Sequence, residues 1–308
     1  MVITNYSITT NLYVTPMDTF VIQLLGGLSK GMILFVLASG LSLIFGVMRV
    51  INFAHGSLYM LGAFLAATVG ARLLGGGPGG FFLMLLLVPL IVAAVGIVME
   101  TTLFRRIYAK EHLLQLLLTY GLTLLLSDVV RMIWGGEYRT LRQPDFLRGG
   151  FEIVGRKFPI YGLFVLIVGP LIAFGLWYLL NRTRWGRIIR AAVANPDMVS
   201  ALGINVRLVM TGVFALGCWL AGLGGALVAG QSAVGLGMDV NIIIEAFAVV
   251  VVGGLGSFGG ALLGALLIGV ILSFGILIWP GGAQLLPFAA MALVLIARPW
   301  GLLGRPER

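Results

Sequence analysis

The chain has 308 residues, of which 60% are hydrophobic and only 10% are charged, and its mean hydropathy is +1.08. Soluble domains carry about 25% charged residues, so a chain this apolar could not cover a soluble surface with polar groups. The composition therefore excludes a soluble protein and predicts several membrane spans, with the net charge of +9 residing mainly in loops rather than in a nucleic-acid site.

Nine apolar segments are candidate spans, because a bilayer core of about 30 Å needs about 20 apolar residues per helix. They are residues 20–47, 51–72, 80–104, 112–133, 160–181, 207–230, 239–254, 259–279 and 283–299. The seventh is short and joins the eighth through a glycine-rich stretch, so we interpret these two as broken half-helices. We predict an all-α, polytopic integral membrane protein with about eight or nine transmembrane segments.

Basic residues predict the orientation, because loops rich in Lys and Arg are usually cytoplasmic. One set of loops, which includes 182–207, holds 12 of them, and the opposite set holds 7, most of them in the loop 134–159. The loop 182–207 is therefore expected in the cytoplasm and the loop 134–159 outside. Residues 20–304 form one transmembrane domain, between an extracytoplasmic tail (1–19) and a cytoplasmic tail (305–308).

The second span begins with a polar cluster in RVINFAHGS (49–57), where Asn52, His55 and Ser57 follow a break. A role in a solute pathway or in gating is one interpretation. The other interpretation is that the histidine has only a structural role.

Several charged residues lie in or near the predicted spans, where charges are costly and usually paired or functional. Asp128 and Arg131 are three residues apart, which favours an ion pair on one helix face. Glu245 follows three isoleucines, and both a pathway or subunit contact and a buried structural carboxylate remain open. The charged residues are Lys30, Glu100, Asp128, Arg131, Asp239 and Glu245.

Within the loop 182–207, Asn195-Pro196-Asp197 predicts the start of a short helix. Asn accepts from free backbone N–H groups, Pro suits the first helical position, and Asp complements the positive helix end. Gly203 closes the helix, and Arg187 and Arg190 lie one turn apart before it. An ordinary basic loop and a docking helix for a cytoplasmic partner both fit this pattern.

The stretch GGLGSFGG (253–260) has the spacing of a dinucleotide-binding loop. That interpretation fails because apolar runs flank it and no acidic residue follows until Glu307. Gly253, Gly254, Gly256 and Ser257 instead predict a helix break of the kind that lines a solute pathway.

Other glycines recur at small-xxx-small spacing, which predicts close helix packing. These are Gly256, Gly260 and Gly264, and Gly222 with Ala226 and Gly230. Cys218 is the single cysteine and there are only two histidines, so no disulfide or metal site is expected.

Taken together, four stretches resemble the branched-chain amino acid permeases of ATP-binding-cassette (ABC) importers, the LivH-like group. They are INFAHGSLYMLGAF (51–64), RWGRIIRAAVANPDMVSALGINV (184–206), VVVVGGLGSFGGALLGALLIGV (249–270) and RPWGLLGRPE (298–307). The resemblance implies a bacterial inner-membrane permease subunit that moves branched-chain or related hydrophobic amino acids. It also implies a LivM-like second permease, two cytoplasmic ATPases and a periplasmic solute-binding protein as partners.

By this resemblance, residues 186–203 form the coupling helix that seats in an ATPase, and Gly186, Arg187, Arg190 and Gly203 match the family pattern. The sequence contains no G-x-x-x-x-G-K-[ST] motif, so the chain is not expected to be an enzyme, and ATP and Mg belong to the partner ATPases. Glu245 departs from the Lys that some members carry.

Two other functions remain open. One is an ABC permease for amides, urea or another small solute. The other is an ion-coupled secondary transporter that uses Glu245, Asp239 and His55.

Overall fold

The computed structural model describes residues 16–73, 78–108, 110–153 and 155–304. The predicted C-terminal tail, and all but residues 16–19 of the N-terminal tail, lie outside these ranges. The helices are α1 (Pro16–Met48), α2 (Ala54–Leu73), α3 (Pro78–Thr102), α4 (His112–Trp134), α5 (Ile160–Arg182), α6 (Arg184–Ala194), α7 (Pro196–Ala201), α8 (Val206–Ala229), α9 (Met238–Gly253), α10 (Phe258–Ile278) and α11 (Leu286–Ala297). Three short 3-10 helices are η1 (Phe104–Arg106), η2 (Asp145–Leu147) and η3 (Pro280–Leu285).

The all-α membrane fold is confirmed. Among the described residues, seven helical segments are long and apolar enough to cross a membrane, slightly fewer than the eight or nine predicted. The predicted spans outside this set are those of α2 and α9. With 16 residues, α9 is about 24 Å long and falls short of the bilayer core, as the sequence indicated.

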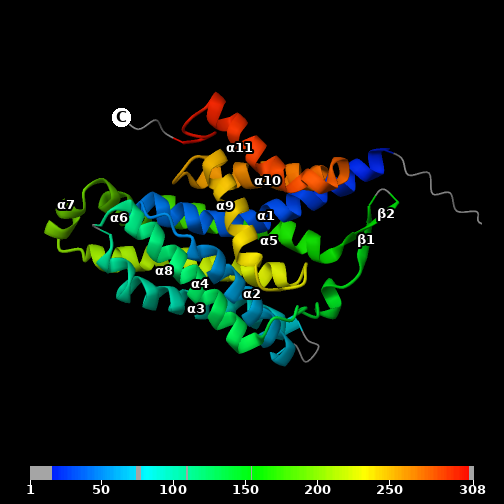
Figure 1. Cartoon of the computed structure of the whole chain (residues 1–308), viewed down its shortest axis with the longest axis horizontal. Coiled ribbons are helices and arrows are strands. Elements are labelled where there is room, and N and C mark those ends of the chain that lie inside the picture. Colours follow the sequence, from blue (N-terminus) through cyan, green and yellow to red (C-terminus); the bar gives the residue numbers. More distant parts are fainter. Residues whose placement is uncertain (1–15, 74–77, 109, 154, 305–308) are drawn as a thin grey trace, which may run out of the picture.

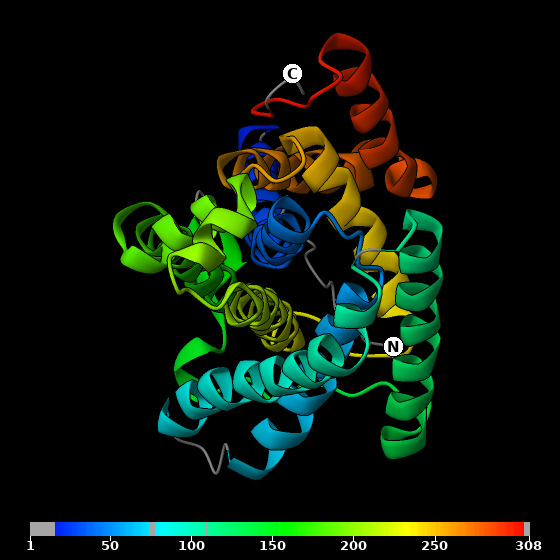
Figure 2. The same cartoon turned by 90° about the vertical axis from the view of Figure 1, so that its left-hand side faces the viewer.

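The long helices α1, α5, α8 and α10 run along the length of the molecule, and α9 crosses them at a steep angle (Figure 1). α6 and α7 lie at one end of the bundle, which is also the end where α9 meets α10. α1 and α8 are central, because α1 packs against α5, α8, α9 and α10, and α8 packs against α1, α2 and α3. Seen from the α6–α7 end, α4 stands at the edge of the bundle (Figure 2).

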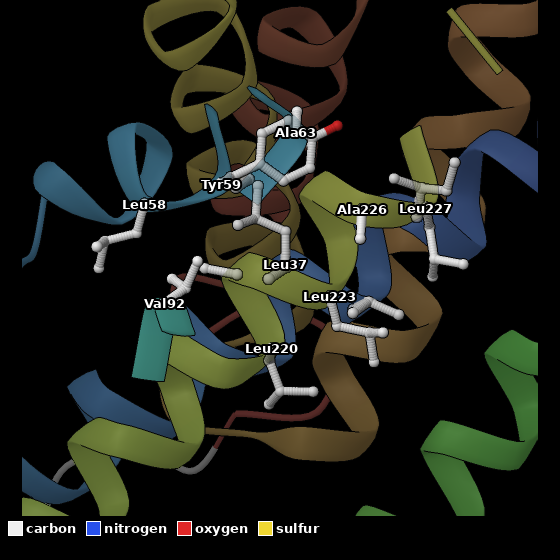
Figure 3. Close-up of a cluster of buried hydrophobic side chains, with 14 of the residues drawn as sticks. Leu37, Leu58, Tyr59, Ala63, Val92, Leu220, Leu223, Ala226 and Leu227 are labelled. Carbon is white, nitrogen blue, oxygen red and sulfur yellow. The ribbon is translucent and has the colours of Figure 1, made fainter. Parts of the chain in front are cut away.

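The core lies where α1, α2, α3 and α8 meet. Leu37 of α1, Tyr59 of α2 and Leu220 of α8 are buried there together (Figure 3). Glycine permits this closeness: a Cβ on Gly225 of α8 would lie 2.1 Å from the carbonyl oxygen of Tyr59. In a membrane, such close backbone approach supplies packing that burial of apolar surface does not.

A two-stranded sheet lies at the opposite end from α6 and α7 and was not predicted from the sequence. β1 (Gly150–Ile153) pairs antiparallel with β2 (Arg156–Pro159), and Phe151 lies opposite Phe158. The strands belong to the loop 134–159. A second contact holds this loop to the bundle, because Arg139 and Val234 exchange backbone hydrogen bonds of 2.8 and 2.7 Å.

Candidate functional site

A buried polar cluster forms where the first turns of α2 and α9 meet. Ser57 Oγ donates to Asp239 Oδ2 at 3.1 Å, and Ser127 Oγ of α4 donates to the same oxygen at 2.6 Å. His55 Nε2 lies 3.1 Å from the carbonyl oxygen of Leu37. Asn52, His55, Ser57 and Asp239 are all at most 1% exposed. Three of the predicted pathway residues are thus close together, and Asp239 and Ser127 join them.

The local sequence explains this arrangement. The chain leaves α1 through Arg49, which has a φ of 55°, and runs without helical structure until α2 begins at Ala54. Gly56 then lets α2 approach α9, because a Cβ there would lie 2.4 Å from the Asp239 carbonyl oxygen. Any larger residue at this position would push the two helix starts apart.

Several polar atoms of this cluster have no hydrogen-bond partner within the described part of the chain. They are Asn52 Oδ1 and Nδ2, His55 Nδ1 and Asp239 Oδ1. The large majority of buried side-chain polar atoms have a hydrogen-bond partner, and each exception calls for an explanation. A set of unpaired donors and acceptors at a junction of broken helices fits a place where a polar solute passes.

One ion pair joins α1 to α9: Lys30 Nζ lies 3.3 Å from Glu245 Oε1. The pairing explains how both charges are accommodated, since an isolated charge at the centre of a membrane helix costs about 2.5–3.5 kcal/mol. The expected pair of Asp128 and Arg131 is wrong. Both side chains are exposed on α4 and neither has an ion-pair partner among the described residues.

The glycine-rich break is present, but it lies elsewhere than the polar cluster. Gly254 and Gly256 have φ values of 102° and 74°, and Ser257 caps α10 by accepting from the Gly260 N–H at 3.1 Å. Gly256 contacts Gly46 near the end of α1, so it is not part of a helical face with Gly260 and Gly264.

The C-terminal segment 298–304 covers this break. Leu302 N–H donates to the Val252 carbonyl at 2.9 Å, and Leu303 N–H donates to the Gly253 carbonyl at 3.0 Å. Because α9 rises about 1.5 Å per residue, Gly253 lies about 20 Å along the helix from Asp239. Apart from Glu245, which lies midway along α9, the predicted pathway residues therefore form two groups at opposite ends of this helix.

The predicted packing glycines make close contacts, but with different neighbours. Gly260 and Gly264 of α10 face Gly253 and Val249 of α9. Gly222 lies between Gly62 of α2 and the Pro89–Val92 turn of α3, whereas Gly230 faces the ring of Tyr161 of α5. The small residues of α8 therefore serve several interfaces and not one continuous seam.

The loop 182–207 contains two helices, and the sequence predicted only the second. α6 is amphipathic and buries Ile189 and Ala192, which pack with Val209 of α8 and Leu43 of α1. Its apolar residues 185, 188, 189 and 192 follow helical periodicity, a signal that could have identified it. Gly186 is required at its start, because a Cβ there would lie 2.0 Å from the Leu180 carbonyl oxygen.

The short helix α7 begins and ends as its sequence predicts. Asn195 Oδ1 accepts from the Met198 N–H at 3.0 Å, and Pro196 is the first helical residue. Gly203 has a φ of 81° and the Ile204 N–H returns to the Val199 carbonyl, as in a Schellman-type end. Val199 is buried, whereas Asp197, the neighbouring Met198 (60% exposed) and Leu202 just beyond the helix (73% exposed) are not.

The two predicted arginines before α7 are both exposed at the same end of the molecule. The Arg190 guanidinium donates to the carbonyl of Leu180. This bond ties α6 back to the end of α5.

A buried carboxylate network nearby was missed by the sequence reasoning. Glu100 is fully buried and accepts from Arg105 Nε at 3.1 Å, Tyr108 Oη at 3.1 Å and Thr211 Oγ1 at 2.8 Å. Nothing in the sequence links Glu100 to Thr211, which is 111 residues away.

Two cavities open beside this network and share Val206 and Arg207 in their walls. One, of about 430 Å³, is lined by Glu100 and Arg105, and the other, of about 510 Å³, by Pro196 and Asp197. The two cavities thus lie on either side of the start of α8, one beside η1 and the other beside α7.

Sequence comparisons with known proteins point to transport permeases. A family model described as "Branched-chain amino acid transport system / permease component" matches residues 23–296. The chain is 31% identical over 296 residues to the high-affinity branched-chain amino acid transport system permease protein BraD of Pseudomonas aeruginosa, covering 92% of this chain and 96% of the relative. It is 28% identical over 300 residues to the corresponding protein LivH of Escherichia coli K12, covering 94% and 96%.

A shorter similarity reaches sugar importers. The fructose import permease protein FrcC of Rhizobium meliloti is 34% identical over 126 residues, which cover 38% of this chain and 34% of the relative. No solved structure matches the chain.

Proposed function

The chain belongs to the family of permease components of branched-chain amino acid transport systems, and we propose that it is the transmembrane subunit of an ABC importer for branched-chain or related hydrophobic amino acids. The names of its full-length relatives support this substrate class. The bacterial inner membrane is the proposed location.

The structural feature on which the proposal mainly depends is the α6–α7 unit. α7 is capped at both ends, is anchored by one buried residue, and presents exposed apolar side chains beside Asp197. Exposed apolar side chains such as Met198 on this capped short helix and Leu202 at its end suit docking to another protein. We propose two cytoplasmic ATPases as the partners that bind here and that hydrolyse ATP with Mg.

The remaining partners and the orientation follow from this assignment. The end that carries α6, α7 and the C-terminal segment is cytoplasmic, and the end with β1 and β2 faces the solute-binding protein. A LivM-like chain is proposed as the second permease subunit. The N-terminus then lies outside and the C-terminus inside, in accordance with the excess of basic residues in the loop 182–207.

The coupling mechanism can be followed through the contacts. Only four residues separate α7 from α8, and α8 packs against α2, whose first turn carries His55 and Ser57. Closure of the ATPases would displace α7 and α8 and thereby move the polar cluster at the start of α2. Two-state movement of packed helices is the usual way in which such a signal spreads.

The test is purification of the tagged chain from its native membrane in mild detergent, with the copurifying subunits identified and their ATPase activity measured. We expect two ATPases and a second permease. The double variant Met198→Asp/Leu202→Asp should lose the ATPases, whereas Phe151→Asp, an equally exposed apolar residue on β1, should retain them. A chain that purifies without ATPases would instead support an ion-coupled carrier.

A further inference from the structure

The accessible face of α1 ends at Lys30. From residue 17 to residue 30 the helix has many partly exposed positions, whereas residues 31–42 are all buried. Lys30 lies 14 residues after the start of α1 and 18 before its end, which corresponds to about 21 and 27 Å along the helix. The ammonium group therefore lies deep within the span, at the point where the accessible face closes.

Glu245 meets this ammonium group from α9 and keeps unused hydrogen-bonding capacity. Its Oε1 is 3.3 Å from Lys30 Nζ, but its Oε2 is buried and has no partner among the described residues. The Lys30 side chain remains 40% exposed and that of Glu245 22% exposed. The pair is thus partly exposed, and only one of the two Glu245 carboxylate oxygens has a partner among the described residues.

Glu100, a fully buried carboxylate, provides a comparison. Both oxygens of Glu100 are occupied, by Arg105, Tyr108 and Thr211, and its side chain is only 1% exposed. That arrangement is what a purely structural carboxylate requires. Glu245 lacks the additional donors, so its Oε2 keeps the capacity to accept from another cationic or N–H partner.

We infer that Lys30 and Glu245 form a binding site for the α-carboxylate and α-ammonium groups of an amino acid zwitterion. The carboxylate of the solute accepts from the Lys30 ammonium, and the ammonium of the solute donates to the Glu245 carboxylate. Charge-assisted hydrogen bonds of this kind are the strong ones. The occupied site stays electrically neutral, which is required at this depth.

This site distinguishes between the solute classes that remained open. A free amino acid carries both complementary charges, whereas urea and simple amides carry neither and gain no charge-assisted bond. The inference rests on the proposed function and adds to it the two residues that would recognise the part common to all amino acids.

The test is uptake of radiolabelled leucine by vesicles that contain the complete complex. The neutral double variant Lys30→Met/Glu245→Gln keeps the charge balance and nearly the same volume. We expect its uptake to fall about tenfold or more, the loss that corresponds to one charge-assisted hydrogen bond. Basal ATPase activity should stay within about twofold of the parent, as should uptake by Asp145→Asn/Arg148→Gln, which removes the exposed pair of the outer loop.

The alternative outcomes are distinct. Uptake by the double variant at the parental rate would show that the pair is structural and would overturn the inference while leaving the proposed function intact. A parent complex that accumulates urea and not leucine would overturn both. If the double variant does not assemble, photo-crosslinking of photo-leucine to the parent complex provides the test. Labelling within one helical turn of Lys30 or Glu245 would support the site. Labelling confined to other segments would contradict it.

Discussion

Ser57 and Asp239 lie 182 residues apart in the chain, yet the hydroxyl of one donates to the carboxylate of the other at 3.1 Å in the interior of the bundle. The bond joins the first turn of α2 to the first turn of α9, and Ser127 of α4 adds a second donor to the same oxygen. Three helices from distant parts of the sequence are thus held together by one carboxylate.

Replacement of Asp239 by alanine should therefore impair transport severely. It leaves the hydroxyls of Ser57 and Ser127 without an acceptor, at a cost of about 1–3 kcal/mol for each buried group that stays unpaired. We expect leucine uptake to fall about tenfold or more. Uptake and the yield of assembled complex should be measured together, with Ser232→Ala, an exposed serine beyond α8, as the control. Normal uptake would mean that the cluster is dispensable.

Gly186→Ala should weaken the docking of α6. The added methyl group would lie 2.0 Å from the carbonyl oxygen of Leu180, so the start of α6 must move away from α5. We expect less ATPase to copurify, with the chain itself still inserted in the membrane. Gly175→Ala is the matched control, because nothing lies within 4 Å of the Cβ position there and the substitution favours the helix. Equal ATPase recovery from both variants would contradict the prediction.

Asn195→Ala removes the side-chain cap of α7, and caps of this type contribute about 0.5–2 kcal/mol. A six-residue helix has little else to hold its first turn, so the ATPase rate stimulated by solute should drop while membrane insertion is unchanged. The control is Asn181→Ala, an exposed asparagine at the end of α5 that caps no helix start. The prediction would be wrong if both variants retained full stimulation.

Glu100→Gln tests the buried network at the C-terminal end of α3. The amide cannot accept from Arg105, Tyr108 and Thr211 as the carboxylate does, and the Arg105 guanidinium loses its ion-pair partner. We expect lower thermal stability of the purified complex, by about 1–3 kcal/mol. Glu111→Gln, an exposed carboxylate before α4, should leave the unfolding temperature unchanged. A stable Glu100→Gln variant would show that the network contributes little.

Much of this fold could be predicted from local signals. The caps of α7 are encoded within nine residues, from Asn195 to Gly203, and each acts on its own backbone. The boundaries of the long spans follow from runs of apolar residues in the same way. The apolar spacing of α6 is also helical, but its 11 residues are too few for a membrane span, so the length of an apolar run does not reveal it.

The candidate site could be predicted only in part, because its contacts are not local. His55 and Ser57 stand out as polar residues at a helix start, but nothing in the neighbouring sequence identifies Asp239 or Ser127 as their partners. The expected pair of Asp128 and Arg131 fails for a related reason. The buried face of α4 runs through Gln115, Thr119, Leu122 and Leu126, and Asp128 lies off that face. Spacing alone places two residues on one side of a helix without saying which side faces the core.

The hydrogen bonds from Leu302 and Leu303 to the last carbonyls of α9 have a practical consequence. Those carbonyls would have no intrahelical partner at an ordinary helix end, so the backbone N–H groups of the C-terminal segment act as their donors in place of water. If α9 tilts during transport, Gly253 moves and both amide protons become free to exchange with deuterium. Exchange at these two amides, followed by mass spectrometry with and without ATP, would report the motion of α9 without an attached probe.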